Sequence, residues 1–476
     1  MEGPARRPIF VLLFLLFLIV AHSLTGRGAF TSYAEVRGVL GPLADILPAE
    51  LKAGNPSQLE AAWTAWVVRH DSEIRGRLER GDEDTIVNWL LFGTSFTGRP
   101  RALLDPPAGS TGRPDAAGPA ADPAQLAQLI AARTADLVAA LVAPGSDERR
   151  LFARRLFERK GYRFAIAADR TRLLEHLGAE VKRLAQEQER YARELDAARR
   201  LGDVSEEFAA RSKLFRERGL SLDTSTLPSF ALERALQQMQ AQGLLGPASV
   251  RRVAVIGPGL DFSDKSSGYD FYPQQTLQPF ALADTLGRLG LSDRSNGVQI
   301  TTLDISPRVN DHLTRARARA QGGSPYVLRL PLDLGVSWKA DVVGYWRRVG
   351  DQIGVETLGA KPPSIGKDLE VRTIQIRPQI AVQIVAEDLD IVAERFDGPP
   401  FDLVVATNVF VYYDTLDQCL ALANVEVMLK PGGFLLSNNA LLELPTSRMH
   451  SSGYLTVQYS NRPDDGDHIV WYRRSP

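Results

Sequence analysis

Residues 253–261 read Val253-Ala-Val-Ile-Gly-Pro-Gly-Leu-Asp261, and this stretch decides the fold of the second half of the chain. Its run of small and β-branched apolar residues predicts a short buried strand that ends at Gly257. Glycine at 257, and again at Gly259, allows a tight turn that a ligand can approach without a Cβ in the way. The stretch therefore predicts a site for a nucleotide-type ligand at the end of a first strand. Taken alone, Gly-Pro-Gly after a strand is equally well explained as an ordinary turn.

Further short apolar runs follow, and helical stretches separate several of them. This pattern predicts a mostly parallel sheet with covering helices. Near the end of the chain, two alternating segments flank a Pro-Asp-Asp-Gly turn, which predicts a terminal antiparallel hairpin. Residues 246–476 are thus expected to form a Rossmann-like domain of the α/β class. The predicted strands cover residues 253–256, 298–303, 380–385, 401–406, 434–437, 454–460 and 467–473.

Residues 25–245 carry helix signals and almost no alternating strand pattern, so an all-α domain is expected to precede the α/β domain. Residues 106–124 are rich in Pro, Ala and Gly, which is typical of a flexible loop or linker. Within residues 174–198, apolar side chains recur in alternating steps of three and four. This spacing suits a helical hairpin or a short coiled-coil seam, and it predicts helical self-association or a protein partner.

The first 24 residues form a leader. Two arginines precede Pro8, and residues 9–21 then contain no polar side chain. A basic start followed by such a run is the layout of a secretory signal peptide, with cleavage after Ser23. Residues 8–24 are 17 in number, short of the roughly 20 that a spanning helix needs, so an uncleaved membrane anchor is the alternative. The protein is expected to be exported or anchored with its bulk on the non-cytoplasmic side, and a cytoplasmic placement with a buried leader stays open.

Composition excludes several classes of protein. Apolar residues make up 44% of the 476 residues and charged residues 24%, which excludes a collagen-like, wholly disordered or multi-span membrane protein. The net charge of −1 gives no signal for nucleic-acid binding. Cys419 is the only cysteine, and the six histidines show no metal-ligand spacing, so neither a disulfide nor a metal site is expected.

Polar residues follow three of the other predicted strands. Asp304 ends the second strand, where a carboxylate can accept hydrogen bonds from ribose hydroxyls; capping of the next helix explains it equally well. Asp388 follows the third strand, where a carboxylate can accept from an adenine amino group. The fourth strand leads to Asn408, and the turn Lys430-Pro-Gly-Gly433 precedes the fifth.

With these features in order, residues 250–476 resemble a class I S-adenosylmethionine-dependent methyltransferase. The strongest match pairs Phe401-Asp-Leu-Val-Val-Ala-Thr-Asn408 with the Leu429-Lys-Pro-Gly-Gly433 turn. The resemblance implies S-adenosylmethionine as cofactor and an unidentified methyl acceptor. The residues that it implies for the cofactor are Gly257 and Gly259 at the methionine part, Asp304 at the ribose, Asp388 with Leu389 at the adenine, and Asn408 facing the methyl donor and the substrate.

No catalytic residue is assigned. The cofactor carries an activated methyl group, so the protein mainly positions a nucleophile, and a base is needed only if the acceptor must lose a proton. Tyr412, Tyr413 and Asp414 follow the fourth strand, where they either touch the acceptor or serve in packing and helix capping.

The chain departs from the family pattern at two positions. Val255 stands where the family usually has an acid, and Asp261 where it often has a third glycine. These departures, together with the leader, motivate two alternatives. One is a non-catalytic exported or membrane-anchored scaffold whose Rossmann-like domain has degenerated. The other is a related transferase that uses a decarboxylated or other adenosyl donor.

Two insertions lengthen the α/β half. Residues 261–278 are polar and aromatic, and include Tyr269, Phe271 and Tyr272. They are expected to form either a lid over the pocket or an ordinary surface insertion. Residues 326–378 form the second insertion, which contains an amphipathic segment near residues 338–353.

Overall fold

A computed structural model describes most of the chain. The described residues are 28–102, 122–201, 219–222, 225–263, 269–293, 297–359, 368–462 and 465–476. The predicted leader, residues 1–24, lies outside them, as does most of the predicted loop at 106–124. The end of that loop is described and is helical, because Asp122 accepts a hydrogen bond from the backbone nitrogen of Ala124 and caps a helix that begins at Pro123.

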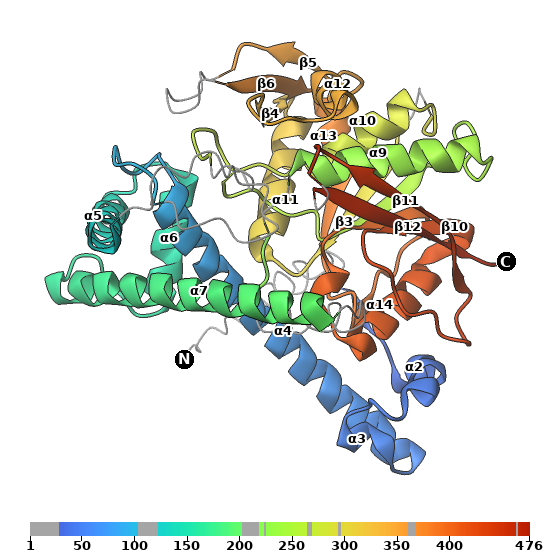
Figure 1. The fold of residues 1–476 in the computed structure, drawn as a ribbon. Coiled ribbons are helices and arrows are strands. Elements are labelled where there is room, and N and C mark those ends of the chain that lie inside the picture. The colour runs from blue at the N-terminus through green and yellow to red at the C-terminus, as the bar shows by residue number, and fades with distance from the viewer. Residues whose placement is uncertain are drawn as a thin grey trace, which may run out of the picture.

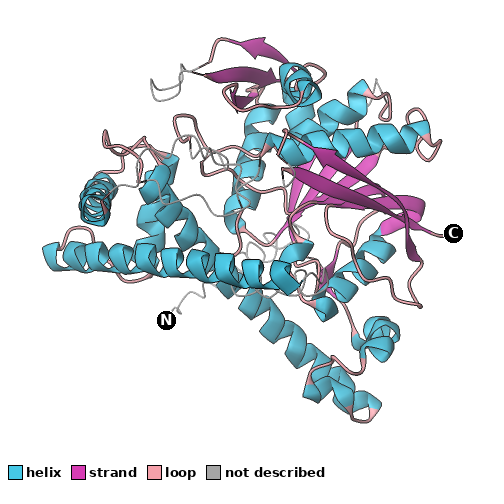
Figure 2. Cartoon of the chain, viewed as in Figure 1, coloured by secondary structure: helices cyan, strands magenta, loops and turns pink. Residues whose placement is uncertain are grey.

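The second half is built around a seven-stranded sheet (Figures 1 and 2). Five of its strands are parallel, and the last two form the expected antiparallel hairpin at one edge, so the mixed α/β architecture is confirmed. In spatial order the strands are β11 (Met449–Gln458), β12 (Gly466–Arg474), β10 (Leu429–Ser437), β9 (Phe401–Ala406), β2 (Arg252–Ile256), β3 (Gln299–Asp304) and β7 (Ile384–Asp388).

The order of the parallel strands indicates where a ligand-binding crevice lies. Counted along the chain, β7-β3-β2-β9-β10 is the order 3-2-1-4-5 of doubly wound folds, which reverses direction between β2 and β9. Ligands of such sheets bind outside the carboxyl ends of the strands at this reversal. Gly257 follows β2 directly, so the glycine turn lies at the reversal.

The third predicted strand begins later than expected. Residues Pro378–Val382 form the short helix α13, and β7 starts only at Ile384. Pro378 occupies the first helical turn, where its fixed φ and missing N–H are favourable, so the apolar run 380–385 is divided between a helix and a strand. Glu387 and Asp388, expected after the strand, form its last two residues.

Helices cover both faces of the sheet, as the side chains of β2 show. Val253 and Val255 pack into a core shared with α9 (Thr226–Ala241), α10 (Gln278–Arg288) and α11 (Pro307–Gln321). Ala254 and Ile256 point to the other face, which is covered by α14 (Thr415–Met428), α2 (Tyr33–Leu40) and part of α4 (Pro56–Phe92). Burial on both faces explains why β2 is uniformly apolar.

The first half is helical, with one small exception. β1 (Ala29–Phe30) pairs with β8 (Glu394–Arg395) of the second half. A separate helical core forms where the end of α4 packs with three further helices. The described residues of this half also form α3 (Ala49–Lys52), α5 (Pro123–Val142), α6 (Glu148–Arg159) and α7 (Ala167–Leu201).

Two of these helices bear on the sequence predictions. Leu177, Val181 and Leu184 of α7 lie on the predicted seam and are buried in the helical core of this chain. Self-association or a partner through residues 174–198 stays a prediction. Among the described residues, α5 alone is long and apolar enough to span a membrane by length and composition. In this structure α5 packs on α4, and its buried Arg133 donates to the carbonyl oxygens of Leu90 and Gly93.

α4 organises the first half and crosses toward the sheet (Figure 1). It begins with a reciprocal capping box in which Asn55 and Gln58 exchange hydrogen bonds of 3.0 and 2.9 Å. Its 37 residues give it a length of about 55 Å at 1.5 Å per residue, enough to reach both cores.

The second insertion forms a small antiparallel sheet at the top of Figure 1. Its strands are β4 (Tyr326–Asp333), β5 (Gly354–Thr357) and β6 (Leu369–Ile376), with β6 in the middle. The predicted amphipathic segment contains α12 (Ala340–Arg348), whose Val342, Tyr345 and Trp346 are buried.

Candidate functional site

The glycine turn after β2 depends on both of its glycines. Gly257 and Gly259 have φ angles of 63° and 72°, in the left-handed region that side chains other than glycine rarely adopt. A Cβ at position 257 would also lie 2.7 Å from Cγ2 of Val409. The backbone nitrogen of Gly257 donates to the carbonyl oxygen of Leu303 at 2.9 Å, which ties the turn to β3.

A pocket opens beside this turn, at the carboxyl ends of β2, β3 and β9. Five of the six residues predicted for the cofactor line it, and Asp388 does not. The structure therefore brings these five residues together at the strand-order reversal, from four separate stretches of sequence. The lining residues are Leu220, Ser221, Leu222, Ile256, Gly257, Gly259, Leu303, Asp304, Ile305, Leu389, Ile391, Thr407, Asn408, Val409, Tyr412 and Tyr413.

Asp304 is the buried acid of this pocket. Its side chain serves the turn before α11, because Oδ1 accepts from the backbone nitrogen of Ser306 at 2.8 Å. Oδ2 is also buried, yet it has no hydrogen-bond partner among the described residues. Burial raises the pKa of Asp304 to about 7 and the nearby charge of Asp388 adds to this, whereas the backbone amides of Ser306 and Gly259 and the charge of Arg308 oppose it. A buried acceptor without a partner is uncommon, and a ligand hydroxyl would satisfy it.

Asp388 faces a different partner. It is paired in register with Asp304 across β3 and β7, but its Oδ1 accepts a hydrogen bond from Nη2 of Arg75 at 3.0 Å. Nη1 of the same guanidinium donates to the carbonyl oxygen of Ile305 at 3.1 Å. The acid predicted at the adenine is thus held by α4 of the first half, and the following residue, Leu389, is the one that lines the pocket.

Asn408 adopts an unusual backbone conformation at the end of β9. Its φ of 59° lies in the left-handed region, which asparagine tolerates better than most side chains. Two hydrogen bonds with Asn438 fix it: Asn408 N donates to Oδ1 of Asn438, and Nδ2 of Asn438 donates to Oδ1 of Asn408, both at 2.8 Å. One bond engages the backbone nitrogen of Asn408 and the other engages its side-chain oxygen, so both atoms have a partner at the pocket.

The three residues expected either to touch the acceptor or to serve in packing and capping differ in their positions. Tyr412 and Tyr413 line the pocket, whereas Asp414 caps α14 by accepting from the backbone nitrogen of Asp417 at 2.9 Å. Burial raises the pKa of Tyr413 well above its ordinary value, so this phenol stays neutral near neutral pH. Gln278, which the sequence reasoning missed, donates to Oγ1 of Thr407 at 2.7 Å from a buried position at the start of α10.

The first insertion docks on the helical half. Asp270 accepts from Nε1 of Trp89 at 2.6 Å and from the backbone nitrogens of Thr94 and Ser95 at 2.9 and 3.0 Å. Although burial opposes ionisation, the hydrogen bonds from Ser95 and Thr94 lower the pKa of Asp270. Tyr269 and Tyr272 are buried, with Phe271 partly buried beside them, and none of the three lines the pocket. The described part of this insertion is therefore neither a pocket lid nor an exposed loop.

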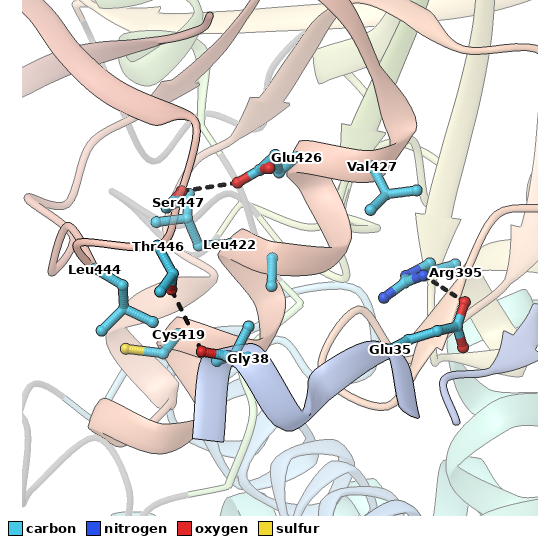
Figure 3. A pocket seen from close by; sticks show the side chains of 12 residues that line it. Glu35, Gly38, Arg395, Cys419, Leu422, Glu426, Val427, Leu444, Thr446 and Ser447 are labelled. Carbon is cyan, nitrogen blue, oxygen red and sulfur yellow. Dashed lines mark hydrogen bonds and ion pairs between the residues drawn. The ribbon is translucent and has the colours of Figure 1, made fainter. Parts of the chain in front are cut away.

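A second cavity lies between α2 and α14 (Figure 3). Its two carboxylates already have partners: Glu35 pairs with Arg395 at 2.8 Å, and Glu426 accepts from Oγ of Ser447 at 2.8 Å. Cys419 lines it, and burial raises the pKa of this thiol to about 11. The thiol is therefore protonated at neutral pH and does not act as a nucleophile there.

Searches among known proteins gave matches only to solved structures. No protein-family model matches the chain, and no curated protein does. The N-methyltransferase NodS from Bradyrhizobium japonicum WM9 is 14% identical over 51% of this chain and 97% of its own, with a TM-score of 0.25. The glycopeptide N-methyltransferase MtfA in complex with S-adenosylmethionine is 15% identical over 52% and 67%, with a TM-score of 0.22. The magnesium protoporphyrin IX methyltransferase ChlM from Synechocystis PCC 6803 is 11% identical over 52% and 79%, with a TM-score of 0.24. These three solved structures, each similar to about half of this chain, are all methyltransferases.

Proposed function

We propose that the pocket beside the glycine turn binds S-adenosylmethionine and that the protein transfers its methyl group to an acceptor. One observation carries the proposal. Gly257, Gly259, Asp304, Leu389 and Asn408, chosen from separate strand ends in the sequence, line a single pocket at the reversal of the strand order. The parallel sheet brings these strand ends together, and the side-chain-free turn and the buried carboxylate among them are the features that a ligand of this class requires.

The residues present fit this cofactor. The glycine turn offers backbone without side chains, which suits close approach by the methionine part. The unpartnered Oδ2 of Asp304 would accept from a ribose hydroxyl. Leu389 and Ile391 supply apolar surface for the adenine ring. Because Asp388 is engaged by Arg75, we assign the adenine contact to these apolar side chains rather than to the Asp388 carboxylate.

The chemistry asked of the protein is mainly positioning. S-adenosylmethionine supplies an activated methyl group when bound, and the chain must hold a nucleophile in line with it. Among the described residues that line the pocket, the ionisable side chains are Asp304, Tyr412 and Tyr413. Asp304 is assigned to the ribose and Tyr413 stays neutral. Tyr412 is then the remaining ionisable side chain of this set that could act as a base, if the acceptor must lose a proton.

Calorimetry with the full chain tests the proposal. S-adenosylhomocysteine, the demethylated product, is expected to bind, and Asp304→Asn is expected to weaken binding about tenfold, since it replaces a charged acceptor with a neutral one of the same shape. Asp311→Asn, at an exposed acid on α11, is the matched control and is expected to bind like the wild type. Failure of the folded wild-type protein to bind this product or S-adenosylmethionine would overturn the proposal.

Two observations favour the non-catalytic alternative. Val255 is fully buried in the core, where the family usually has an acid, and Arg75 already occupies Asp388. A thermal shift distinguishes the two functions, because a ligand that binds only the native state raises its stability. An adenosyl-donor transferase of another kind would bind S-adenosylmethionine without transferring its methyl group.

The acceptor and the location of the protein stay open to experiment. Export or membrane attachment through residues 8–24 is a proposal from the sequence, and that segment lies outside the described residues. N-terminal sequencing of the mature protein, combined with cell fractionation, tests it. Location matters to the proposed activity, because S-adenosylmethionine must be available where the folded domain resides.

A further inference from the structure

One wall of the pocket comes from the first half of the chain. Leu220, Ser221 and Leu222 line the pocket, and we call residues 219–222 the strap. The carbonyl oxygen of Leu222 accepts from the backbone nitrogen of Leu260 at 3.0 Å, just after the glycine turn. The strap is therefore joined directly to the segment proposed to hold the methionine part of the ligand.

The strap docks on α4 by backbone contact at Gly81. The carbonyl oxygen of Arg77 is the expected helical partner of the nitrogen of Gly81, four residues later, and it also accepts from the backbone nitrogen of Leu220 at 3.2 Å. A Cβ at Gly81 would lie 1.8 Å from the carbonyl oxygen of Leu220. A Cβ at Gly219 would lie 2.3 Å from the nitrogen of Gly81. The strap and α4 can approach each other this closely only because both positions are glycine.

On its other side the strap reaches Tyr412. The backbone nitrogen of Ser221 donates to the Tyr412 hydroxyl at 3.4 Å, and Nη1 of Arg77 donates to the Tyr412 carbonyl oxygen at 3.0 Å. The strap and α4 thus both contact Tyr412, in the segment after β9. Leu222 of the strap contacts Leu260, in the segment after β2. The strap spans the reversal of the strand order, where the pocket lies.

We propose that the strap closes over the ligand in this pocket and sets the rate of its release. The inference rests on the proposed function, since it takes the ligand to be S-adenosylmethionine or its product. Among the described residues, three hydrogen bonds and the buried side chain of Leu220 hold the strap, and opening of the strap requires these interactions to break. Release of a covered ligand requires such opening, and opening of covering segments limits turnover in many enzymes.

Glycine substitutions on α4 test the strap without touching the pocket. Gly81→Ala introduces the clash with Leu220, whereas Gly76→Ala is the matched control, because a Cβ there meets no described atom within 4 Å. Both changes add the same methyl group to the same helix. Stopped-flow dissociation of S-adenosylhomocysteine is expected to be about tenfold faster in Gly81→Ala than in wild type, as for a strap whose undocked fraction is about ten times larger. Gly76→Ala is expected to match the wild type.

Two further variants guard against loss of folding. Gly219→Ala makes the same clash from the strap, and Leu220→Ala removes the buried anchor of the strap while leaving α4 unchanged. Faster release in a folded Gly81→Ala or Gly219→Ala variant, with an unchanged rate in Gly76→Ala, supports the strap. Binding by the wild type with equal release rates in all folded variants overturns the strap alone. Absence of binding in the wild type overturns the proposed function and the strap with it.

Discussion

The guanidinium of Arg75 in α4 donates a hydrogen bond to the carboxylate of Asp388 at the end of β7, across 313 residues of sequence. A side chain of the helical half thereby engages one oxygen, Oδ1, of the carboxylate that the sequence assigns to the adenine. The neighbouring acid, Asp304, keeps a buried oxygen without a partner. The two acids are aligned in the sheet but differ in what they can offer a ligand.

This difference predicts unequal effects on binding. Asp388→Asn is expected to change the dissociation constant for S-adenosylhomocysteine by less than about threefold, because its carboxylate contacts Arg75 and not the pocket. Asp304→Asn is expected to raise that constant about tenfold. Calorimetry on both variants compares them directly. If Asp388→Asn weakens binding as much as Asp304→Asn, Arg75 must leave Asp388 when the ligand enters.

The pKa of Asp304 predicts a pH dependence of stability. Burial raises that pKa from 3.8 to about 7, so the folded state keeps the proton to a higher pH than the unfolded chain does. The free energy of unfolding should therefore fall as the pH rises through this interval. Asp304→Asn should remove this part of the dependence. Urea unfolding at a series of pH values measures it, and equal slopes for wild type and variant would contradict the prediction.

Ligand binding should show the opposite trend. Ribose hydroxyls favour the ionised form of Asp304, so binding is expected to release a proton near pH 7 and to tighten as the pH rises from about 6 to about 8. Calorimetry in buffers of different ionisation enthalpy counts the proton. An affinity that is independent of pH in the wild type, as expected for Asp304→Asn, would show that the ligand does not contact this carboxylate.

The crowding of Gly257 predicts a specific loss. Gly257→Ala and Gly243→Ala both place alanine at a positive φ, 63° and 72°, but only the first brings a Cβ within 4 Å of a described atom, Cγ2 of Val409. Gly243→Ala should lower the free energy of unfolding by about 1 kcal/mol from backbone strain alone. Gly257→Ala should lower it further and abolish binding. Thermal unfolding with and without ligand separates the two effects, and similar behaviour of both variants would remove the steric argument.

We expect His70 of α4 to stabilise the fold through its contacts with two acids of the second half. Its ring stacks on Trp66 and lies 3.5 Å from Asp390 and 3.7 Å from Asp417. His70→Phe keeps an aromatic ring but leaves both acids unpaired, so the free energy of unfolding should fall by about 1–3 kcal/mol.

An exposed histidine provides the control for that change. His450→Phe, at a side chain that is 54% exposed, should alter the free energy of unfolding by less than about 0.5 kcal/mol. Chemical denaturation measures the two variants. An equally small loss for His70→Phe would show that its contacts with Asp390 and Asp417 do not stabilise the fold.

The sequence predicted the sheet and most of the pocket because parallel strands bring their carboxyl ends to one edge. Gly257, Asp304 and Asn408 could be grouped from strand ends alone. The start of β7 could not, since an apolar run does not show where a helix passes into a strand, although Pro378 was a signal for the helix. The role of Val255 in the core follows only from knowing which helices cover that face.

Contacts that the first half makes with the sheet and the pocket could not be predicted from the sequence. The hydrogen bond of Arg75 to Asp388 joins two residues that share no local sequence pattern. Arg75 lies on a helix, and the periodicity of a helix predicts only which of its faces is apolar. The strap contacts Gly81 through backbone atoms, and no side-chain spacing encodes such an approach. Gly81 and Gly219 were the only visible signal, and glycine has many other uses in a chain.

The core shared across the sheet has a consequence for the ancestry of the protein. Val36 and Leu40 of α2, with Trp63 and Trp66 of α4, belong to the same buried cluster as the sheet. A gene fragment that begins at residue 246 would encode the sheet and α14 but lack α2 and α4, which complete the cover of this face. Recombination at that point would thus yield two unstable products, and the halves are expected to be inherited as one unit. Distant descendants should vary together at α2, at α4 and on the face of the sheet that they cover.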